Sequence, residues 1–501
     1  EIGSGLVGSE MCIRDSYYAL EVNLKLTGVD NIPVEVFASA KNLKAGTDLD
    51  KENRYDTRRA RFTLQRQKNG ECRLLIPFSV FDTPKASQNT IRRIKSIAFR
   101  LSGEGGGKVK VLSTRLLEGN SVKTTADCYS RPGEPGDTII YPVTVTNCEP
   151  TSQSVYFSIQ KYGWEAFPAT VEPAQLELAS GETRKVNVCV IVPPGIPAGG
   201  REKQTLQILP SANPAAVQTL TFTTLRSMPH PFTIHTAEGW DEVRRKAENY
   251  DWAKDRKERY VQDAKAWIVP LRPPYVANGD GIPYLCATTH EHGLMNNAIA
   301  WQLTRSPEYA RKVKQFLLMI SDYQNGFPLT RKASHQSSVQ EGHFFQHLAQ
   351  AYDLIQDAGI LTDAECTQIE YTFRLYIDLF LRYKSTGGAN WAVSQLTGVF
   401  FCALAIQDFQ LVDEVLYAPS CLIDKFRTYT MPDGWWYECT VSYNLWVASE
   451  YVQIGLALNP FGYSLLTEKF PVDYNLTPEY NKVGANAVSY THLTLPTKLE
   501  V

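Results

Sequence analysis

The hydrophobic period of the chain changes once, at Pro229-His230-Pro231. Before this point apolar and polar residues alternate with a period of two, which is typical of half-buried strands. After it apolar residues recur at helical spacing, starting at Thr236, which suits a helix N-cap and is followed by acidic residues. The sequence therefore predicts a β-rich N-terminal half, a proline-containing linker and a helical C-terminal half.

The β-rich half divides into two units. Residues 17–117 contain alternating segments, and the glycine-rich stretch Gly103–Gly107 between two apolar runs indicates a hairpin. We expect an antiparallel sandwich or jelly roll here, similar in pattern to carbohydrate-binding jelly rolls. Residues 118–228 show regularly spaced strands separated by proline and glycine turns, which predict an immunoglobulin-like sandwich.

The helical half is expected to consist of paired helices joined by short loops. Ser306-Pro307 places a proline at a first helical position, and Thr362 with Glu365 forms a capping box. This pattern predicts stacked helical hairpins within residues 229–486. The expected helices lie at about 236–268, 293–304, 307–323, 338–358, 362–383, 390–407, 410–428 and 439–458.

The two ends of the chain show no strand or helix pattern. Residues 1–16 and 487–501 resemble translated sequencing-adapter segments, so we exclude both from the fold prediction. The chain is accordingly expected to be a fragment. The absence of a signal peptide then gives no information about secretion.

Charge and cysteine usage exclude several classes of function. The formal net charge of −2 gives no support to a nucleic-acid partner, and no apolar run approaches the roughly 20 residues of a membrane span. An acidic partner would need local cations. The ten cysteines include no Cys-x-x-Cys pair, so we expect isolated thiols and no zinc ribbon. A disulfide between Cys128 and Cys148 stays an open possibility.

The most informative stretch lies between Met431 and Tyr443. The turn dipeptide Asp433-Gly434 leads into three adjacent aromatics, Trp435, Trp436 and Tyr437, then Glu438 and finally Tyr443. Aromatic rings beside polar groups commonly bind sugars, because the apolar faces of a pyranose stack on π-systems. Asn390-Trp391 places another aromatic beside an amide. Together these blocks resemble the catalytic core of the heparinase II/III-like polysaccharide lyases.

The resemblance covers about residues 229–470 and implies a fold and an activity. Lyases of this family close helical hairpins into an incomplete (α/α) toroid, followed by an antiparallel sandwich. The resemblance therefore implies a truncated toroid, a periplasmic or secreted enzyme, and cleavage of a uronic-acid-containing polysaccharide by β-elimination without a metal or cofactor. Family members often take a second acid/base histidine from the C-terminal sandwich, and no such histidine can be assigned here.

β-Elimination needs a base at C5, an acid at the glycosidic oxygen and a group that neutralises the uronate carboxylate. By the resemblance, Asn390 is the neutralising amide; from spacing alone the ordinary interpretation is a helix N-cap. Tyr443 matches the family's catalytic acid/base tyrosine, although a core tyrosine is the ordinary interpretation. Tyr437 is a competitor that lies nearer the turn.

Further residues are expected to bind substrate. Glu438 either orients Tyr443, binds a sugar hydroxyl or stabilises a helix start; the family often has glycine after this glutamate, where this chain has Cys439. Three tryptophans are either platforms on which sugars stack or buried core aromatics: Trp391, Trp435 and Trp436.

Histidines supply the remaining candidates. His343 and His347 lie four residues apart on one helix face, a spacing that can bind zinc, but no third ligand is evident and we expect no metal. His343 is instead a candidate for substrate binding, with core packing as the alternative. His290 and His292 have no obvious partner. Arg331 and Lys332 can meet an acidic polymer or form a solvated loop.

Two other functions compete with the lyase. A glycoside hydrolase on the same toroid needs paired carboxylates, for which Asp433 and Glu438 are the close candidates. A non-catalytic glycan-binding protein would use the two β units. Ultraviolet absorbance of the product distinguishes elimination from hydrolysis, because only elimination creates a conjugated C4–C5 double bond.

Overall fold

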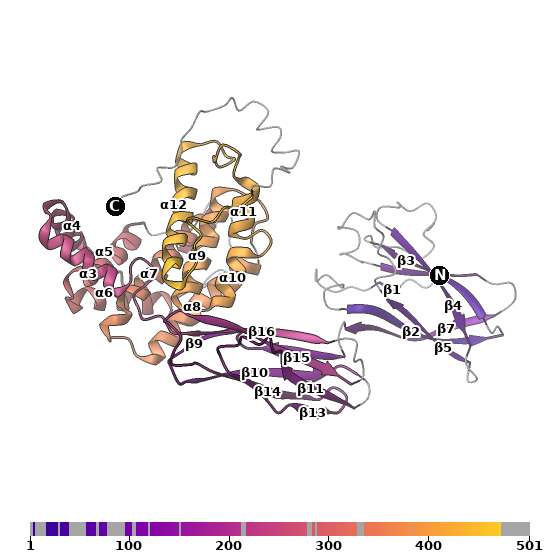
Figure 1. The fold of residues 1–501 in the computed structure, drawn as a ribbon. Coiled ribbons are helices and arrows are strands. Elements are labelled where there is room, and N and C mark those ends of the chain that lie inside the picture. The colour runs from indigo at the N-terminus through magenta and orange to yellow at the C-terminus, as the bar shows by residue number, and fades with distance from the viewer. Residues whose placement is uncertain are drawn as a thin grey trace.

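The computed structural model places strands in the N-terminal half and helices in the C-terminal half, as the change of period predicts (Figure 1). No helix among the described residues is long and apolar enough to cross a membrane. The described residues are 4–5, 17–28, 31–39, 57–66, 70–77, 96–102, 107–118, 121–149, 152–211, 217–277, 283–285, 288–327, 335–382 and 384–471.

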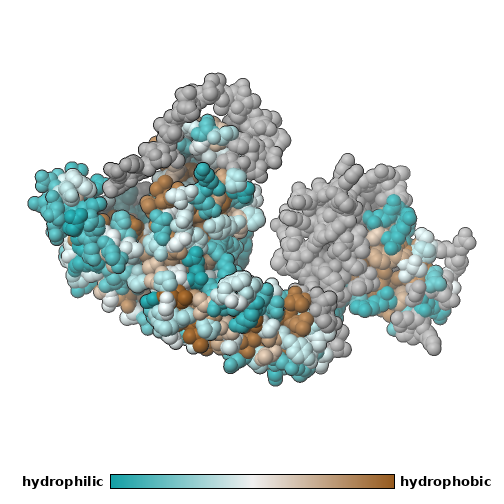
Figure 2. Space-filling view, viewed as in Figure 1, coloured by the Kyte–Doolittle hydropathy of each residue, from teal (hydrophilic) through white to brown (hydrophobic). Residues whose placement is uncertain are grey.

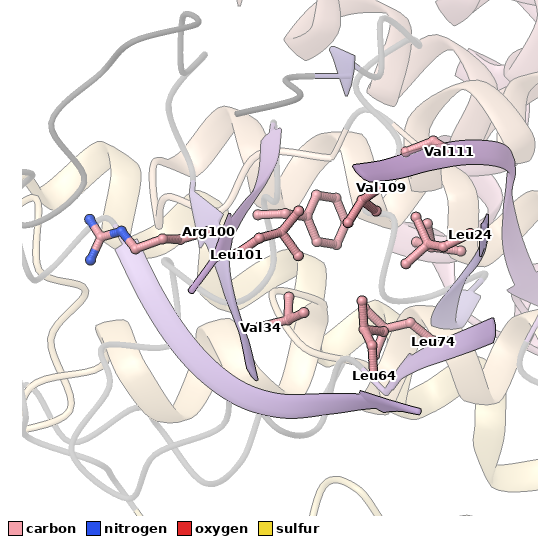
Figure 3. Close-up of a pocket in the computed structure, with 10 residues that line it drawn as sticks. Leu24, Val34, Leu64, Leu74, Arg100, Leu101, Val109 and Val111 are labelled. Atoms are coloured by element: carbon pink, nitrogen blue, oxygen red, sulfur yellow. The ribbon is translucent and has the colours of Figure 1, made fainter. Parts of the chain in front are cut away.

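The first β unit consists of two antiparallel sheets with strand orders β1-β6-β3-β4 and β5-β2-β7. Alternate side chains such as Val34 and Val36 are buried between the sheets, leaving a cavity of about 150 Å³ that Leu64 and Leu74 also line (Figure 3). The strands are β1 (Ser4–Gly5), β2 (Tyr17–Thr27), β3 (Asn31–Ser39), β4 (Thr57–Gln65), β5 (Glu71–Pro77), β6 (Ser96–Leu101) and β7 (Lys108–Glu118).

The hairpin expected in this unit was wrong. The stretch Gly103–Gly107 does not close a hairpin, because β6 pairs with β3 while β7 pairs with β2 in the other sheet. A glycine-rich link can cross between sheets as readily as it can turn within one. Within residues 1–16, Ser4–Gly5 pairs with β6. The remainder of 1–16 and all of 487–501 lie outside the described residues.

The second β unit is a sandwich of two sheets, ordered β12-β14-β10-β8 and β13-β11-β15-β16-β9. All its pairings are antiparallel except that of β16 with β9. Valines and other apolar residues of alternating strand positions, such as Val143 and Val188, fill its interior. The strands are β8 (Val122–Ala126), β9 (Ser130–Gly133), β10 (Thr138–Asn147), β11 (Gln153–Ile159), β12 (Ala169–Glu172), β13 (Gln175–Leu178), β14 (Thr183–Ile191), β15 (Arg201–Pro210) and β16 (Gln218–Arg226).

The cysteines in the described part of the chain are free thiols. Cys128 accepts a hydrogen bond from Arg131 Nε at 2.9 Å, and the thiol of Cys148 donates to the Thr146 carbonyl at 3.7 Å. The open possibility of a Cys128–Cys148 bridge is therefore excluded in this structure.

The helices start where the capping signals indicate. Thr236 caps α3, Ser306 precedes Pro307 in α6, and Thr362 exchanges hydrogen bonds with Glu365 at α8. The long helices expected at 236–268 and 410–428 are each interrupted, the first at the extended residue Tyr250. The helices are α3 (Ala237–Asn249), α4 (Asp251–Ala266), α5 (Thr288–Thr304), α6 (Pro307–Ile320), α7 (His335–Ile355), α8 (Asp363–Arg382), α9 (Asn390–Ala405), α10 (Phe409–Tyr417), α11 (Leu422–Tyr429) and α12 (Val441–Leu458).

Helices α5, α7, α9 and α12 form one layer in which all four run parallel. In each pair of neighbouring helices, the residue numbers of the contacting residues increase along both helices. This happens only when the two helices point the same way. The pairs are Glu291–His347 and Gln302–Leu354 between α5 and α7, Gly342–Ser394 and Phe345–Cys402 between α7 and α9, and His343–Glu450 and Gln346–Gln453 between α7 and α12.

A second layer runs in the opposite direction. Helix α6 turns back from α5 after a two-residue link, and it is parallel to α8 because Lys314 pairs with Glu365 and Ser321 with Gln368. From α5 to α9 consecutive helices therefore alternate between layers, as expected for stacked helical hairpins. Figure 2 shows that the surface of α3 and α4, at one edge of the stack, is largely hydrophilic.

The second β unit and the helices share one continuous core. Leu225 and Met228 at the end of the sandwich belong to the same buried cluster as the helices. Gln407 exchanges hydrogen bonds with the backbone of Met228, and the Ser130 hydroxyl accepts from the first amide of α10 at Phe409. The division at residues 228/229 stays a prediction about domains, since apolar packing crosses it.

Candidate active site

Asn390 is the first residue of α9 and not its N-cap, which is Ala389. The N-cap interpretation was therefore wrong. The backbone N–H of Asn390 donates to Glu438 Oε2 at 2.8 Å, whereas its side-chain amide has no hydrogen-bond partner among the described residues. Asn390 is 9% exposed, so its amide lies at the edge of the buried core.

The loop before Asn390 is held by α11. The ammonium group of Lys425 donates to the carbonyls of Ser385 and Gly387, and the Tyr429 hydroxyl donates to the carbonyl of Thr386 at 3.2 Å. Gly388 lies directly on the Tyr429 ring, where a Cβ would come within 2.2 Å of Cγ. The absence of a side chain at position 388 thus permits the contact that places Asn390.

Lys425 gives this brace a pH dependence. Burial lowers the pKa of Lys425 from 10.5 to about 8. Between these values the unfolded chain binds more protons than the folded chain, so the free energy of unfolding rises with pH. Urea unfolding measures this effect. Between about pH 8 and 10, the free energy of unfolding of wild type should rise by about 2 kcal/mol relative to that of Lys425→Met. Lys254→Met, at an exposed lysine, is the control; parallel wild-type and Lys425→Met curves would contradict the prediction.

The aromatic block forms a tight turn that ends at Glu438. Gly434 has a φ of +86°, and the Asp433 carboxylate accepts from the Trp435 N–H at 3.1 Å. Cys439 has a φ of +52°, a left-handed conformation that costs a non-glycine residue roughly 1 kcal/mol or more. This explains why glycine suits the position after the glutamate, and the chain folds in the same way with cysteine.

Glu438 links the start of α9 to the start of α12. Its Oε2 accepts from Asn390 N–H and from Trp436 Nε1 at 3.0 Å. The backbone N–H of Trp436 donates to Asn444 Oδ1 at 2.9 Å, and Asn444 adjoins Tyr443. Hydrogen bonds through Glu438 and Trp436 therefore connect Asn390 to Asn444, the residue that follows Tyr443. The carboxylate stabilises a helix start, as one interpretation held, but that helix is α9.

Glu438→Ala is expected to lower the free energy of unfolding by about 2 kcal/mol or more, because two partly buried donors lose a charged acceptor. Chemical denaturation of the full chain measures this effect. Glu258→Ala, which removes an exposed carboxylate on α4, should change stability little. Equal stability of the two variants would show that Glu438 does not hold the turn.

Tyr443 lies in the first turn of α12 and is 40% exposed. Its hydroxyl has no hydrogen-bond partner in the described part of the chain. The competitor Tyr437 packs against Tyr429, with 5.2 Å between ring centroids, and its backbone donates to Tyr429. The structure thus gives Tyr437 a packing role and leaves Tyr443 accessible.

The three tryptophans differ in exposure. Trp436 is 2% exposed and packs within the helical core, so the prediction that it is a sugar platform was wrong. Its indole N–H donates to Glu438 Oε2. Trp391 and Trp435 are half-buried, and both stay predicted platforms.

His343 belongs to a polar group that the sequence did not reveal. Its Nε2 lies 3.0 Å from Glu450 Oε1, and Trp446 Nε1 donates to the same oxygen at 2.8 Å. His347 Nδ1 pairs with Glu291 of α5. Trp446 and Glu450 stand four residues apart on α12 and therefore share one helix face. An aromatic and an acid at this spacing were the sequence signal that could have predicted the group. Its partner, however, is on another helix.

The other polar candidate residues do not belong to the group around His343 and Glu450. Among the described residues no cluster of three metal-ligating side chains occurs. His290 accepts a hydrogen bond from Trp267 Nε1 at 3.2 Å, and burial lowers its pKa. Asp433 is engaged by its own turn and Glu438 by two N–H donors. Arg331 and Lys332 lie outside the described residues.

Comparison with models of protein families and with curated proteins finds no match. Among solved structures, an alginate lyase from Bacteroides ovatus matches with a TM-score of 0.37 and 11% identity, covering 48% of this chain and 79% of that one. The PapD-like domain 7 of human CEP192 matches with a TM-score of 0.17 and 20% identity, covering 22% and 84%. At these scores the likenesses carry no inference about activity.

Proposed function

We propose that the chain is a polysaccharide lyase that cleaves a uronic-acid-containing glycan by β-elimination. One observation carries the proposal: Asn390 and Tyr443, which the sequence selected independently of any contact, start adjacent parallel helices and are joined through Glu438, Trp436 and Asn444. Both functional groups are without partners among the described residues. An amide and a phenol held in this way suit the two roles that elimination needs.

In this proposal Asn390 donates hydrogen bonds from its amide to the uronate carboxylate as negative charge develops there. Tyr443, as the phenolate, takes the proton from C5, and the resulting phenol gives it to the glycosidic oxygen as the C4–O bond breaks and the C4–C5 double bond forms. The parallel helices α7, α9 and α12 also turn their N-terminal ends the same way, which favours an anion near that end. The N-terminal amide of α9 itself is already occupied by Glu438.

The remaining expectations form part of the same proposal. The two antiparallel helix layers are proposed to be an arc of an (α/α) toroid spanning residues 229–486, preceded by sandwiches at 17–117 and 118–228. His343, Trp391, Trp435 and Glu438 are proposed to surround the substrate or support the groups that do. The proposed setting is periplasmic or secreted, which the resemblance implies, and no metal or cofactor takes part.

The test is to incubate the chain with polymers of mannuronate and of glucuronate and to follow ultraviolet absorbance. A rise in absorbance from a conjugated C4–C5 double bond is expected. New reducing ends without that absorbance would instead indicate hydrolysis. Binding without either product would favour a glycan-binding protein.

A further inference from the structure

Two histidine–carboxylate pairs lie on one face of α7. The side chains of His343 and His347 are 35% and 26% exposed, and their ring centroids are 6.1 Å apart. The paired carboxylates are hidden: the Glu450 side chain is 3% exposed and that of Glu291 is 6% exposed. A ligand approaching this face therefore meets the two imidazoles before it meets either carboxylate.

The contacts determine which nitrogen of His343 carries a proton. Glu450 Oε1 is 3.0 Å from His343 Nε2, and Trp446 Nε1 lies within hydrogen-bond distance of both atoms, 2.8 Å from the oxygen and 3.0 Å from the nitrogen. An ionised carboxylate only accepts, so Nε2 donates to it and the Trp446 N–H is directed to the same oxygen. Nδ1 is then the ring nitrogen left for a ligand, and the corresponding nitrogen of His347 is Nε2, since its Nδ1 meets Glu291.

The surroundings favour a positive charge on His343. Glu450 Oε2 is buried without a hydrogen-bond partner among the described residues, so the carboxylate charge is compensated mainly by the imidazole. Burial alone would lower the pKa of His343, but the hydrogen bond and charge of Glu450, with the charge of Glu291, raise it overall.

The nearest other histidine is His347, whose charge in the protonated form is balanced by Glu291. Helix α9 contributes no ionisable side chain except Cys402, which is buried. Helix α12 adds Tyr443 and Tyr451, which are neutral when protonated. On α7 itself the nearby groups are His347 and the buried Glu341, whose pKa burial raises to about 7. The charged form of His343 is present below its raised pKa and is lost as pH rises through that value.

We propose that His343 and His347 together recognise the carboxylate of a uronic acid unit, donating N–H groups from the two ring nitrogens that face away from Glu450 and Glu291. The inference rests on the proposed function and specifies how the site selects acidic sugars. Each pair is close to electrically neutral when the histidine is charged, so selection depends on the direction of the N–H groups. Trp446, one helical turn from Tyr443, connects this recognition site to the proposed catalytic residue.

The experiment measures calorimetric binding of hexasaccharides to the full chain, using β-mannuronate, heparosan and, as a neutral match, β-mannohexaose. We expect wild type to bind at least one acidic hexasaccharide at about pH 7.5 and to bind mannohexaose at least about tenfold more weakly. NMR of labelled histidine follows the His343 signal as a function of pH. The pKa of His343 obtained in this way should rise when the acidic ligand is added.

Two variants separate recognition from structure. His343→Gln keeps a donor toward Glu450 and should weaken acidic binding at least about tenfold. Glu450→Gln keeps the hydrogen bond but removes the charge; it should weaken binding at about pH 7.5 and recover it at about pH 5.5, where an ordinary histidine is charged. His292→Gln, at an exposed histidine on α5, should bind as wild type does.

Three outcomes would overturn the inference. Unchanged affinity and pH profile in both His343→Gln and Glu450→Gln would defeat it while leaving the lyase proposal intact. Equal binding of neutral and acidic hexasaccharides would do the same. Absence of acidic binding by wild type at either pH would defeat the inference together with the proposed function.

Discussion

Tyr443→Phe is expected to abolish turnover of a uronate polymer and to leave substrate binding nearly unchanged. The substitution removes one oxygen from a side chain that is 40% exposed and whose hydroxyl makes no hydrogen bond to a described residue, so the described fold loses no hydrogen bond. If the phenol transfers the proton at C5, phenylalanine cannot replace it, and losses of 100-fold or more, on the order expected for a general acid/base, should follow. Steady-state kinetics with product absorbance measures the loss, and calorimetry measures binding.

Tyr437→Phe is the matched control, since Tyr437 lies six positions earlier and packs against Tyr429. It should keep most of the turnover. If Tyr437→Phe is inactive while Tyr443→Phe is active, the roles of the two tyrosines are reversed. Near-normal turnover in both variants would remove this block from the chemistry.

Asn390→Ala is expected to reduce kcat by a factor corresponding to about 3 kcal/mol of lost transition-state stabilisation. The contact between Asn390 and Glu438 uses the backbone N–H, so alanine preserves it and also suits the first turn of a helix. The variant should therefore melt within a degree or two of wild type, on the order of a surface substitution. The loss should appear in kcat more than in KM, because charge on the carboxylate grows in the transition state.

A second substitution makes this test specific. Asn444→Ala removes the side-chain acceptor of the Trp436 N–H and should lower stability, with a smaller effect on kcat. Asn390→Ala that keeps wild-type kcat would show that the amide does not meet the reacting carboxylate. Asn390→Ala that unfolds would show that the amide is structural.

The division between strands and helices was predictable, because burial of alternate residues and burial along one helix face are local consequences of sequence. The break at Tyr250 was not, since no proline or glycine marks it; there the Asn249 amide satisfies the Arg245 carbonyl. A hairpin was wrongly predicted at Gly103–Gly107, because a glycine-rich stretch does not reveal the pairing partners of the strands on either side of it.

The site was predictable only in part. Asn390, Glu438 and Tyr443 stand in recognisable motifs, and the contact between Asn390 and Glu438 confirms that the motifs meet. Lys425 and Glu450 were missed because each acts on a segment distant in sequence: Glu450 meets His343 across 107 positions. The buried state of Trp436 likewise depends on packing by several helices, which no spacing within the motif reveals.

The shared core between the second sandwich and the helices limits how this architecture can be rearranged. Arg201 of β15 stacks on Phe409 and Tyr463, with its guanidinium carbon 4.8 and 4.3 Å from the ring centroids, and donates to the Phe461 carbonyl at 2.8 Å. Exchanging this sandwich for another module would uncover aromatic rings at the base of α10 and α12. The sandwich and the helices must therefore be engineered as one piece.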